Sequence, residues 1–322
     1  MPYRIAVTGA NGFIGTALCP ALTACGHQII AQTRRSDPPR RATGGVQWVA
    51  FEISDAAETQ WRSLLDGADA VVHLAAQAHE RATGQSLRSL RAANVEAVVN
   101  LARQAREVGI KRLVYLSSIG VLGQSSSAPL VETDAPAPAD PYAWSKYEAE
   151  KALWEIVSGT DMSLTVIRPP LVHGPGAPGN FGRLLGWARK GRLLPLGAVT
   201  GNQRSLVGRQ NLVDFIHRAL THPQAGNQTF HVADDETVST TDLLRMLAHA
   251  AGQDPKLVGV PPVILRTGAR LLGRRAMIER LLGSLTVDTR KARDLLGWRP
   301  PLSLEQGLRE AVIAHPDAES AA

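Results

Sequence analysis

The chain has 322 residues and a mass of 34.4 kDa, enough for one large domain or two of ordinary size. Its hydrophobic content of 44% and charged content of 20% are globular values, which argues against a disordered chain. The formal net charge is +6, yet the arginines are spread along the sequence without a basic stripe. We therefore interpret the charge as a solvated surface that suits a small anionic substrate, and we expect no nucleic-acid partner.

The sequence also predicts the compartment. No apolar stretch approaches the roughly 20 residues that span a bilayer, and the best candidate, Leu257–Leu265, is broken by two prolines. We expect no membrane insertion and no signal peptide, since the apolar run Ile5–Val7 is short and glycines follow it. Cys19 and Cys25 fall within one predicted helix, where a disulfide framework makes no sense. These features predict a cytoplasmic protein with buried or half-buried thiols.

A glycine-rich turn follows the first predicted strand, Tyr3–Val7, and leads into a helix expected over Phe13–Cys25. Gly9 allows a tight turn, Gly12 lets backbone approach a pyrophosphate, and Gly15 lets the helix pack close to the strand. Placed between a strand and a helix, this spacing predicts a dinucleotide-binding site. The alternative is a turn with a structural role only.

The residues after the second predicted strand, Gly26–Thr33, bear on the choice of cofactor. Folds that prefer NAD usually carry a carboxylate here for the ribose 2′-hydroxyl. This chain has Arg34 and Arg35 instead, and no acidic residue before Asp37. An arginine can bind a 2′-phosphate, so NADP(H) is favoured and NAD(H) is the alternative. Both arginines could instead only solvate a loop.

Strands and helices alternate along the next part of the chain. Strands are expected over Val46–Phe51 and Ala68–Leu74, with a helix near Ala56–Leu65 between them, and a long amphipathic segment runs over Ser86–Val108. This order predicts an α/β fold of the Rossmann type, with a doubly wound parallel sheet. A fifth strand, Lys111–Ser118, ends in two hydroxyl side chains, and ligands of such sheets bind beyond the carboxyl ends of the strands.

A helix is predicted to begin at Asp140, a good N-cap, with Pro141 at its first position, and to end at Ser158. Tyr142 and Lys146 are four residues apart and therefore lie on one helical face. A nearby positive charge favours the charged form of an acid, so Lys146 is expected to lower the Tyr142 pKa from about 10 toward working pH. Such a tyrosine can exchange a proton with a sugar hydroxyl or ketone as hydride moves. The alternative is a surface pair without chemistry.

A sixth strand is predicted over Ser163–Arg168. Beyond it the alternation of strands and helices gives way to short helical patterns over Leu212–Leu220, Thr240–Ala251, Pro262–Leu272 and Leu304–Ala314. We predict a smaller, mainly helical, C-terminal substrate domain there. The expected division is 1–170 for the dinucleotide-binding domain, with return segments near 203–233, then 171–202 and 234–315 for the substrate domain, and 316–322 as a disordered tail. The cleft between the domains is the default substrate site.

Five motifs together identify a family: the glycine triplet, Ser117-Ser118, Tyr142-x-x-x-Lys146, Arg168-Pro169 and Leu296-Gly-Trp-Arg-Pro300. With them the chain resembles the extended short-chain dehydrogenases/reductases, the NAD-dependent epimerase/dehydratase family of nucleotide sugars, over nearly its whole length. Further segments are similar to UDP-sugar 4-epimerase-like proteins and to UDP-4-keto-sugar reductases of surface-polysaccharide pathways: Leu194–Gly197, Arg204–Val207 and Asn211–Asp214.

The resemblance implies roles for individual residues. Ser118 would hydrogen-bond the reacting oxygen, Tyr142 would transfer the proton, and Lys146 would also hold the nicotinamide ribose. With the glycine turn and the arginine pair, the expected cofactor-binding residues are Gly9, Asn11, Gly12, Phe13, Ile14, Gly15, Arg34, Arg35, Glu52, Ile53, Leu74, Ala75, Ala76, Asn94, Tyr142, Lys146 and Pro169. For Asn94, an ordinary satisfied helix residue is an equally good interpretation.

The resemblance also implies a substrate site, formed by His79, Ser118, Asn180 and Arg204. Asn180 and Arg204 match family positions that hold the diphosphate of the substrate, and a guanidinium suits this because it binds phosphate oxygens in pairs. No metal site is expected. A homodimer is expected by analogy with the family.

Three departures from the family pattern matter. The 4,6-dehydratases carry Asp-Glu after the active-site Ser or Thr, but Ile119-Gly120 stand here and cannot move protons, so dehydration is not expected. The usual Val-Tyr-Gly is Val121-Leu122-Gly123. Leu171 replaces an asparagine that contacts the sugar nucleotide in 4-epimerases, which leaves the exact substrate open.

The leading hypothesis is an NAD(P)-dependent oxidoreductase that acts at C4 of a UDP-sugar, either a UDP-hexose or a UDP-N-acetylhexosamine. Reduction of a 4-keto sugar is slightly favoured over 4-epimerisation with bound NAD, because the NADP-type pocket and Leu171 both point to it. A reductase of a non-nucleotide carbonyl compound is a second hypothesis, although such substrates lack the diphosphate for Asn180 and Arg204. A non-catalytic NADP-binding protein is a third.

Overall fold

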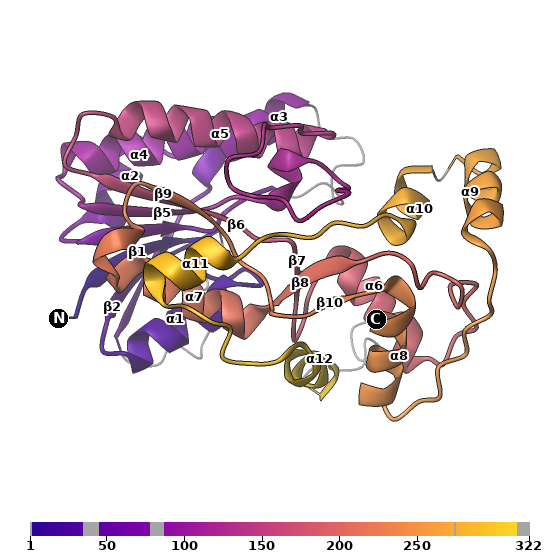
Figure 1. Cartoon of the computed structure of the whole chain (residues 1–322). Helices are drawn as coiled ribbons and strands as arrows, with labels where there is room; N and C mark the ends of the chain where they lie inside the picture. Colours follow the sequence, from indigo (N-terminus) through magenta and orange to yellow (C-terminus); the bar gives the residue numbers. More distant parts are fainter. Residues whose placement is uncertain (1, 35–44, 78–86, 274, 314–322) are drawn as a thin grey trace.

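A seven-stranded parallel sheet forms the centre of the computed structural model, which describes residues 2–34, 45–77, 87–273 and 275–313 (Figure 1). The strand order is β3-β2-β1-β4-β5-β6-β9, and every neighbouring pair is parallel. The strands are β1 (Arg4–Thr8), β2 (Gln28–Thr33), β3 (Val46–Ala50), β4 (Ala70–His73), β5 (Arg112–Leu116), β6 (Ser163–Arg168) and β9 (Gln228–His231). The predicted Rossmann-type sheet is confirmed.

Helices cover both faces of this sheet, because successive strand residues point to opposite sides. Ile5 and Val7 of β1 pack into one hydrophobic core and Ala6 packs into the other. The first core is covered by α1 (Gly15–Ala24) and α7 (Arg209–Thr221), drawn below the sheet in Figure 1. The second is covered by α2 (Glu58–Leu65), α4 (Ala97–Glu107) and α5 (Pro141–Val157), drawn above it.

The long amphipathic segment predicted over Ser86–Val108 is divided in the structure. Helix α3 (Leu87–Arg91) is followed by a π-helical turn, Ala92–Glu96, and then by α4. A π turn fits an extra residue into a helix and is frequent at functional sites. Asn94 lies within this turn and is buried.

A second, smaller body holds a three-stranded sheet in the order β10-β8-β7. Its strands are β7 (Leu171–His173), β8 (Arg204–Gly208) and β10 (Thr237–Val238), and its helices are α6 (Gly179–Arg189), α8 (Thr240–Ala250), α9 (Pro262–Leu271), α10 (Arg275–Leu282) and α12 (Leu304–Ile313). The body is mainly helical as predicted, but its sheet was missed. Residues 316–322, expected to be disordered, lie outside the described residues.

The domain division expected from the sequence stays a proposal, and the cores support it with one change. Buried Phe181, Leu247 and Leu308 share a core in the second body. By contrast, α11 (Arg290–Leu296) and Trp298 pack into a core of the first body, although both lie within 234–315. We therefore propose that this segment belongs with the dinucleotide-binding domain.

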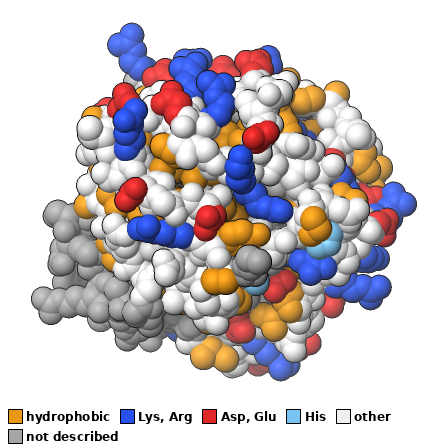
Figure 2. Space-filling view, turned by 90° about the vertical axis from the view of Figure 1, so that its left-hand side faces the viewer, with side chains coloured by type: hydrophobic (Ala, Val, Ile, Leu, Met, Phe, Trp, Pro, Cys, Tyr) orange, Lys and Arg blue, Asp and Glu red, His pale blue; other side chains and the backbone are white. Residues whose placement is uncertain are grey.

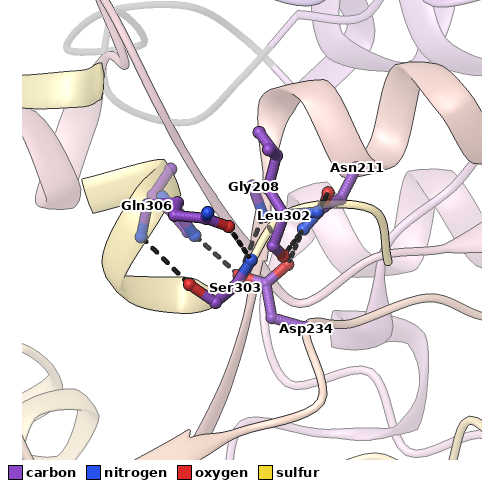
Figure 3. Close-up of polar contacts among 7 residues, drawn as sticks. Gly208, Asn211, Asp234, Leu302, Ser303 and Gln306 are labelled. Atoms are coloured by element: carbon purple, nitrogen blue, oxygen red, sulfur yellow. Dashed lines mark hydrogen bonds and ion pairs between the residues drawn. The ribbon is translucent and has the colours of Figure 1, made fainter. Parts of the chain in front are cut away.

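A buried polar cluster joins the two bodies (Figure 3). The Asp234 carboxylate, just after β9, accepts hydrogen bonds from the Gly208 N–H at 2.9 and 3.1 Å and from Asn211 Nδ2 at 2.7 Å. The Asn211 amide also donates to the Leu302 carbonyl at 2.8 Å and accepts from the Leu302 N–H at 2.9 Å. His173 Nε2 of β7 lies 2.8 Å from Asp234 Oδ2. The cluster therefore ties the small sheet, α7 and the start of α12 together.

The same part of the fold explains two of the sequence motifs. Trp298 Nε1 donates a hydrogen bond of 2.7 Å to the Asp214 carboxylate, and the Trp298 ring packs edge-on against Phe215 with ring centroids 5.0 Å apart. Packing and hydrogen bonding therefore bring Asn211–Asp214 and Leu296–Pro300 together.

The two cysteines differ in exposure. Cys19 is buried within α1, and burial raises the pKa of its thiol to about 12. Cys25 is exposed, so the expectation of a buried or half-buried thiol was wrong there, because the residue caps the end of α1. Among the described residues, every helix is too short or too polar to cross a bilayer.

Candidate active site

The glycine turn connects the carboxyl end of β1 to α1. The Gly12 N–H donates a 2.9 Å hydrogen bond to the Gly9 carbonyl, which closes the turn. Gly9 has a φ of 66°, and a Cβ built on it would lie 2.9 Å from the Ala75 backbone. A Cβ on Gly15 would collide with the Gly9 carbonyl oxygen. Larger residues at Gly9 and Gly15 would therefore push the turn away from the sheet.

The backbone N–H groups at the start of α1 suit a pyrophosphate. Within the described part of the chain, no protein acceptor is recorded for the N–H groups of Phe13, Ile14 and Gly15. Free N–H groups and the positive end of a helix dipole together favour an anion. The residues of this turn therefore fit the dinucleotide expected from the sequence.

The other expected cofactor residues lie at the carboxyl ends of neighbouring strands. The Ala75 N–H lies 3.4 Å from Thr8 Oγ1, which holds the segment after β4 beside the glycine turn. Glu52 follows β3, and its carboxylate caps a 3-10 turn that begins at Ile53. Arg34 is exposed at the end of β2. Arg35 and His79 lie outside the described residues.

Helix α5, which carries Tyr142 and Lys146, begins near the carboxyl end of β5, and Ser118 follows that strand. Asp140 caps α5 as predicted, accepting a 2.9 Å hydrogen bond from the Ala143 N–H. Lys146 is buried and donates a 2.8 Å hydrogen bond to the Leu116 carbonyl, the last residue of β5.

Ser118 lies just beyond that strand. Its Oγ accepts a 3.1 Å hydrogen bond from the Gly120 N–H. A Cβ built on Gly120 would lie 3.3 Å from Ser118 Oγ and 3.5 Å from the Ala143 side chain. Ser118 and the first turn of α5 are thus separated only by Gly120. Pro169 is close as well, since its carbonyl accepts a 3.0 Å hydrogen bond from the Ile119 N–H.

The structure corrects the expected pKa of Tyr142. Burial raises it to about 12, and the Asp140 carboxylate adds to the rise, so the expectation that Lys146 lowers it was wrong. Burial also lowers the pKa of Lys146 to about 7, against a smaller opposing effect of Glu150. The lysine is therefore only partly charged near neutral pH, and its Nζ lies 6.0 Å from the Tyr142 ring centroid. Tyr142 accordingly keeps its proton at neutral pH.

The Asn94 side chain has hydrogen-bond partners for both its oxygen and its nitrogen, and one of them lies on α5. Its Oδ1 accepts a 2.7 Å hydrogen bond from the Gln77 N–H, and its Nδ2 donates to the Gln77 carbonyl at 3.1 Å and to Ser145 Oγ at 2.9 Å. Ser145 Oγ in turn donates to the Tyr142 carbonyl at 2.7 Å. Asn94 therefore connects the segment after β4 to the helix that carries Tyr142 and Lys146.

A buried ion pair supports the same site. Arg168 at the end of β6 binds both carboxylate oxygens of Glu150, at 3.0 and 2.6 Å, and Ser117 Oγ donates to this carboxylate at 2.5 Å. The three side chains link β5, α5 and β6. Sequence analysis did not single out Glu150. Its spacing could have indicated this role, because Glu150 lies four residues after Lys146 and therefore on the same helical face.

Tyr115 contacts Lys146, and His73 stacks on Tyr115. Sequence analysis placed both residues in strands and gave them no role in the site. Lys146 Nζ is 4.6 Å from the Tyr115 ring centroid, and the Tyr115 and His73 rings stack with centroids 5.8 Å apart. His73 Nδ1 lies 2.8 Å from Thr8 Oγ1. Burial, with a smaller effect of Lys146, lowers the pKa of His73 to about 3.

This pKa predicts a loss of stability in acid. As pH falls from 6.5 to about 3, the unfolded chain binds a proton at residue 73 that the folded chain does not, so the free energy of unfolding should fall. His73→Phe should make this slope shallower without abolishing it, because burial also lowers the pKa of His231. Denaturant unfolding across that pH range measures the slope. An unaltered slope in His73→Phe would contradict the assignment.

The expected phosphate-binding residues have separate surroundings. Arg204 is the first residue of β8, and its Nη1 donates to the carbonyls of Arg280 and Gly283 at 2.8 and 3.0 Å. Burial, with the Arg280 charge, lowers its pKa. Asn180 lies on α6, where its Oδ1 accepts a 2.6 Å hydrogen bond from Arg183. The recorded contacts do not join Asn180 to Arg204.

Arg280 is a cation that sequence analysis missed. It lies on α10, and its Nη2 is 3.3 Å from the Asp140 carboxylate that caps α5. The chain therefore brings two guanidinium groups, those of Arg204 and Arg280, to the side of the small body that faces the Tyr142 helix. No motif signalled this, since Arg280 and Asp140 are far apart in the sequence.

Fold and site together define an enzyme of the Rossmann type that uses a nicotinamide cofactor. Residues 5–233 match the model of the NAD dependent epimerase/dehydratase family, and the chain belongs to this family. The predicted family and enzyme class are thus confirmed.

Three similar proteins show the range of the relatives. The chain is 37% identical to a UDP-glucose 4-epimerase of Vibrio cholerae, over 99% of this chain and 98% of that protein. It is 29% identical to a 2-alkyl-3-oxoalkanoate reductase of Stenotrophomonas maltophilia, over 95% of this chain and 97% of that protein. The crystal structure of Thermotoga maritima UDP-glucose 4-epimerase with UDP-glucose has a TM-score of 0.79 at 24% identity, covering 97% and 98% of the two chains, and supports the fold alone.

Proposed function

We propose that the protein is a UDP-sugar 4-epimerase that works with a bound nicotinamide cofactor. The proposal rests on the placement of Lys146 and Ser118 at the carboxyl end of β5, two strands from the glycine turn, with Tyr142 one helical turn before Lys146. The epimerase from V. cholerae, which is similar over its whole length, supports C4 as the reacting carbon. The sequence slightly favoured a 4-keto reductase, and we now favour the epimerase alternative instead.

The proposed residue roles follow from their positions. A nicotinamide cofactor, when bound, would supply hydride exchange at C4. In its phenolate form, Tyr142 would take the proton of the O4 hydroxyl as a ketone forms, and the resulting phenol would return that proton when the hydroxyl forms again. Ser118 donates a hydrogen bond to the same oxygen. Glu150 counteracts the effect of burial on Lys146, and a charged Lys146 stabilises the phenolate that Tyr142 passes through.

The substrate would be a UDP-hexose or a UDP-N-acetylhexosamine. Arg204 and Arg280 supply positive charge for the diphosphate, and Asn180 remains a proposed contact. Dehydration is not part of the proposal, because Ile119 is buried among apolar residues and Gly120 has no side chain. The cytoplasmic location and the homodimer also remain predictions.

One assay separates the candidate reactions. The purified protein is mixed with UDP-glucose or UDP-N-acetylglucosamine without added reduced cofactor, and the sugar product is identified. Formation of the C4 epimer supports the proposal. If no epimer forms, but a UDP-4-keto sugar is reduced with matching consumption of NADPH, the enzyme is a 4-keto reductase, as Leu171 favours. Reduction of a 3-oxoalkanoate alone would instead support the chemistry named for the S. maltophilia relative.

A preference for NADP(H) over NAD(H) stays part of the proposal, supported by exposed Arg34 at the end of β2. Arg34→Ala should weaken NADPH binding by about tenfold or more, since a hydrogen bond to a charged group contributes about 1.5–3 kcal/mol. NADH binding should change little. Fluorescence titration of both cofactors measures this, with Arg62→Ala on α2 as a control. An equal loss for both cofactors would show that Arg34 does not discriminate between them, and no loss for either would show that it only contributes solvated charge.

A further inference from the structure

Helix α9 and its flanks expose an unusual amount of apolar surface. Val263 is 69% exposed, Ile264 60% and Leu271 84%, and no residue of α9 is buried. Figure 1 draws α9 at the right-hand edge of the molecule, opposite β2. Exposed apolar patches of this kind mark interaction sites.

The apolar side chains form one stripe along the helix. Val263 and Leu271 are eight residues apart and therefore lie on the same face, with Ile264 beside them. The opposite face, with Leu265 and Ala269, packs against the hydrophobic core of the small body. The helix is therefore anchored by one side and presents the other to its surroundings.

The segment that contains the stripe is rich in basic residues. Residues 255–283 contain six Lys or Arg and a single acidic residue, Glu279, so this segment holds +5 of the net +6 charge. Arg266 and Arg270 lie on α9 next to the stripe, and of these Arg266 is 3.5 Å from Glu279. By contrast, the far end of the molecule intersperses acidic and basic side chains (Figure 2). The partner of α9 must therefore be anionic and able to take up apolar side chains.

Two other partners fit this surface less well. A second copy packed through the same face would bring two basic segments together, and like charges repel. Single-stranded nucleic acid is bound with aromatic side chains on which bases stack, and residues 255–283 contain no Phe, Tyr or Trp. An anionic lipid surface matches both features, because its headgroups attract arginine and its acyl boundary accepts the stripe.

We propose that α9 docks the protein on anionic lipid bilayers. The helix has 10 residues, which is too short to span a bilayer, so it would lie in the interface with Val263, Ile264 and Leu271 directed inward. Helix α10 follows directly and carries Arg280, so docking would place the proposed diphosphate side of the molecule close to the lipid surface.

The test is co-sedimentation of the full-length protein with vesicles of phosphatidylcholine, alone or mixed with phosphatidylglycerol. We expect binding to the mixed vesicles to exceed binding to phosphatidylcholine alone, and to fall as salt is raised. Ile264→Ser/Leu271→Ser and Arg266→Gln/Arg270→Gln should each weaken it by about tenfold or more. Exposed controls elsewhere, Val108→Ser and Arg62→Gln, should bind like the unaltered protein.

Vesicle binding is measured without the proposed epimerase reaction, so the docking proposal and the proposed function can each fail without the other. All variants change exposed or half-exposed side chains outside the active site, and thermal unfolding should confirm that each is folded. Equal binding to both vesicle types, or unchanged binding of both double variants, would overturn the proposal. So would a dimer in light scattering that Ile264→Ser/Leu271→Ser dissociates while vesicle binding persists, since the stripe would then contact a second copy.

Discussion

Tyr142→Phe is expected to lower turnover by a factor on the order of 10²–10⁴, the usual loss when a general acid–base group is removed. The phenol hydroxyl is the only group changed, and the ring keeps its packing at the start of α5. The hydroxyl is the group through which the proton leaves and returns to O4 in the proposed reaction. The loss should therefore appear in turnover, while cofactor binding stays within about twofold of its original value.

The matched control is Tyr147→Phe, which removes a second phenol hydroxyl from the same helix. The Tyr147 ring packs against Trp144, with centroids 6.1 Å apart, and takes no part in the proposed reaction. Turnover of the UDP-sugar and fluorescence titration of the cofactor are measured on both variants. Near-normal turnover in Tyr142→Phe would remove Tyr142 from the mechanism.

Arg168→Met is expected to reduce the free energy of unfolding by about 3–5 kcal/mol, the usual effect of removing one partner of a buried ion pair. Glu150 would be left in a buried position with Ser117 as its remaining hydrogen-bond partner. The link between β6 and α5 would be lost as well. Chemical denaturation measures the change.

Two comparisons make this prediction specific. Adding Glu150→Gln to Arg168→Met removes the stranded charge and should recover part of the loss. Arg62→Met breaks an exposed ion pair with Glu58 and should cost about 1 kcal/mol or less. If Arg168→Met costs no more than Arg62→Met, the Glu150 carboxylate is not isolated from water as the structure implies.

The main sheet was readable from the sequence because its strands are continuous apolar runs. The bounds of β6 agree with the predicted Ser163–Arg168, and Asp140 caps α5 as its residue type predicts. Strand β9 was missed as a strand because Gln228–His231 is short and has one apolar residue. Strands β7 and β10 were missed because they span only three and two residues, and β8 was missed because Arg204–Gly208 has an arginine at one end and a glycine at the other.

The candidate site was predicted less completely than the fold. Spacing along one helix is enough to place Tyr142 and Lys146 on the same face, and Ser118 was assigned to the site by the family resemblance. The pKa of Tyr142 depends instead on how deeply the helix is packed, which residue types do not reveal. Arg280 and Glu150 gain their roles from partners distant in the chain, Asp140 and Arg168, so only the folded structure shows them.

The contact between Asp214 and Trp298, which are far apart in the chain, affects how the protein folds during translation. Trp298, Ala292 and Leu296 complete a core whose other members begin with Ile5, so the first part of the chain to leave the ribosome cannot close that core by itself. Until nearly 300 residues have been synthesised, Phe215 and its apolar neighbours on α7 lack the ring that covers them. The nascent chain must therefore present this surface to chaperones and proteases until its last part has been made. A fragment that ends after β9 would keep this exposed surface permanently, so we expect it to aggregate when it is expressed alone.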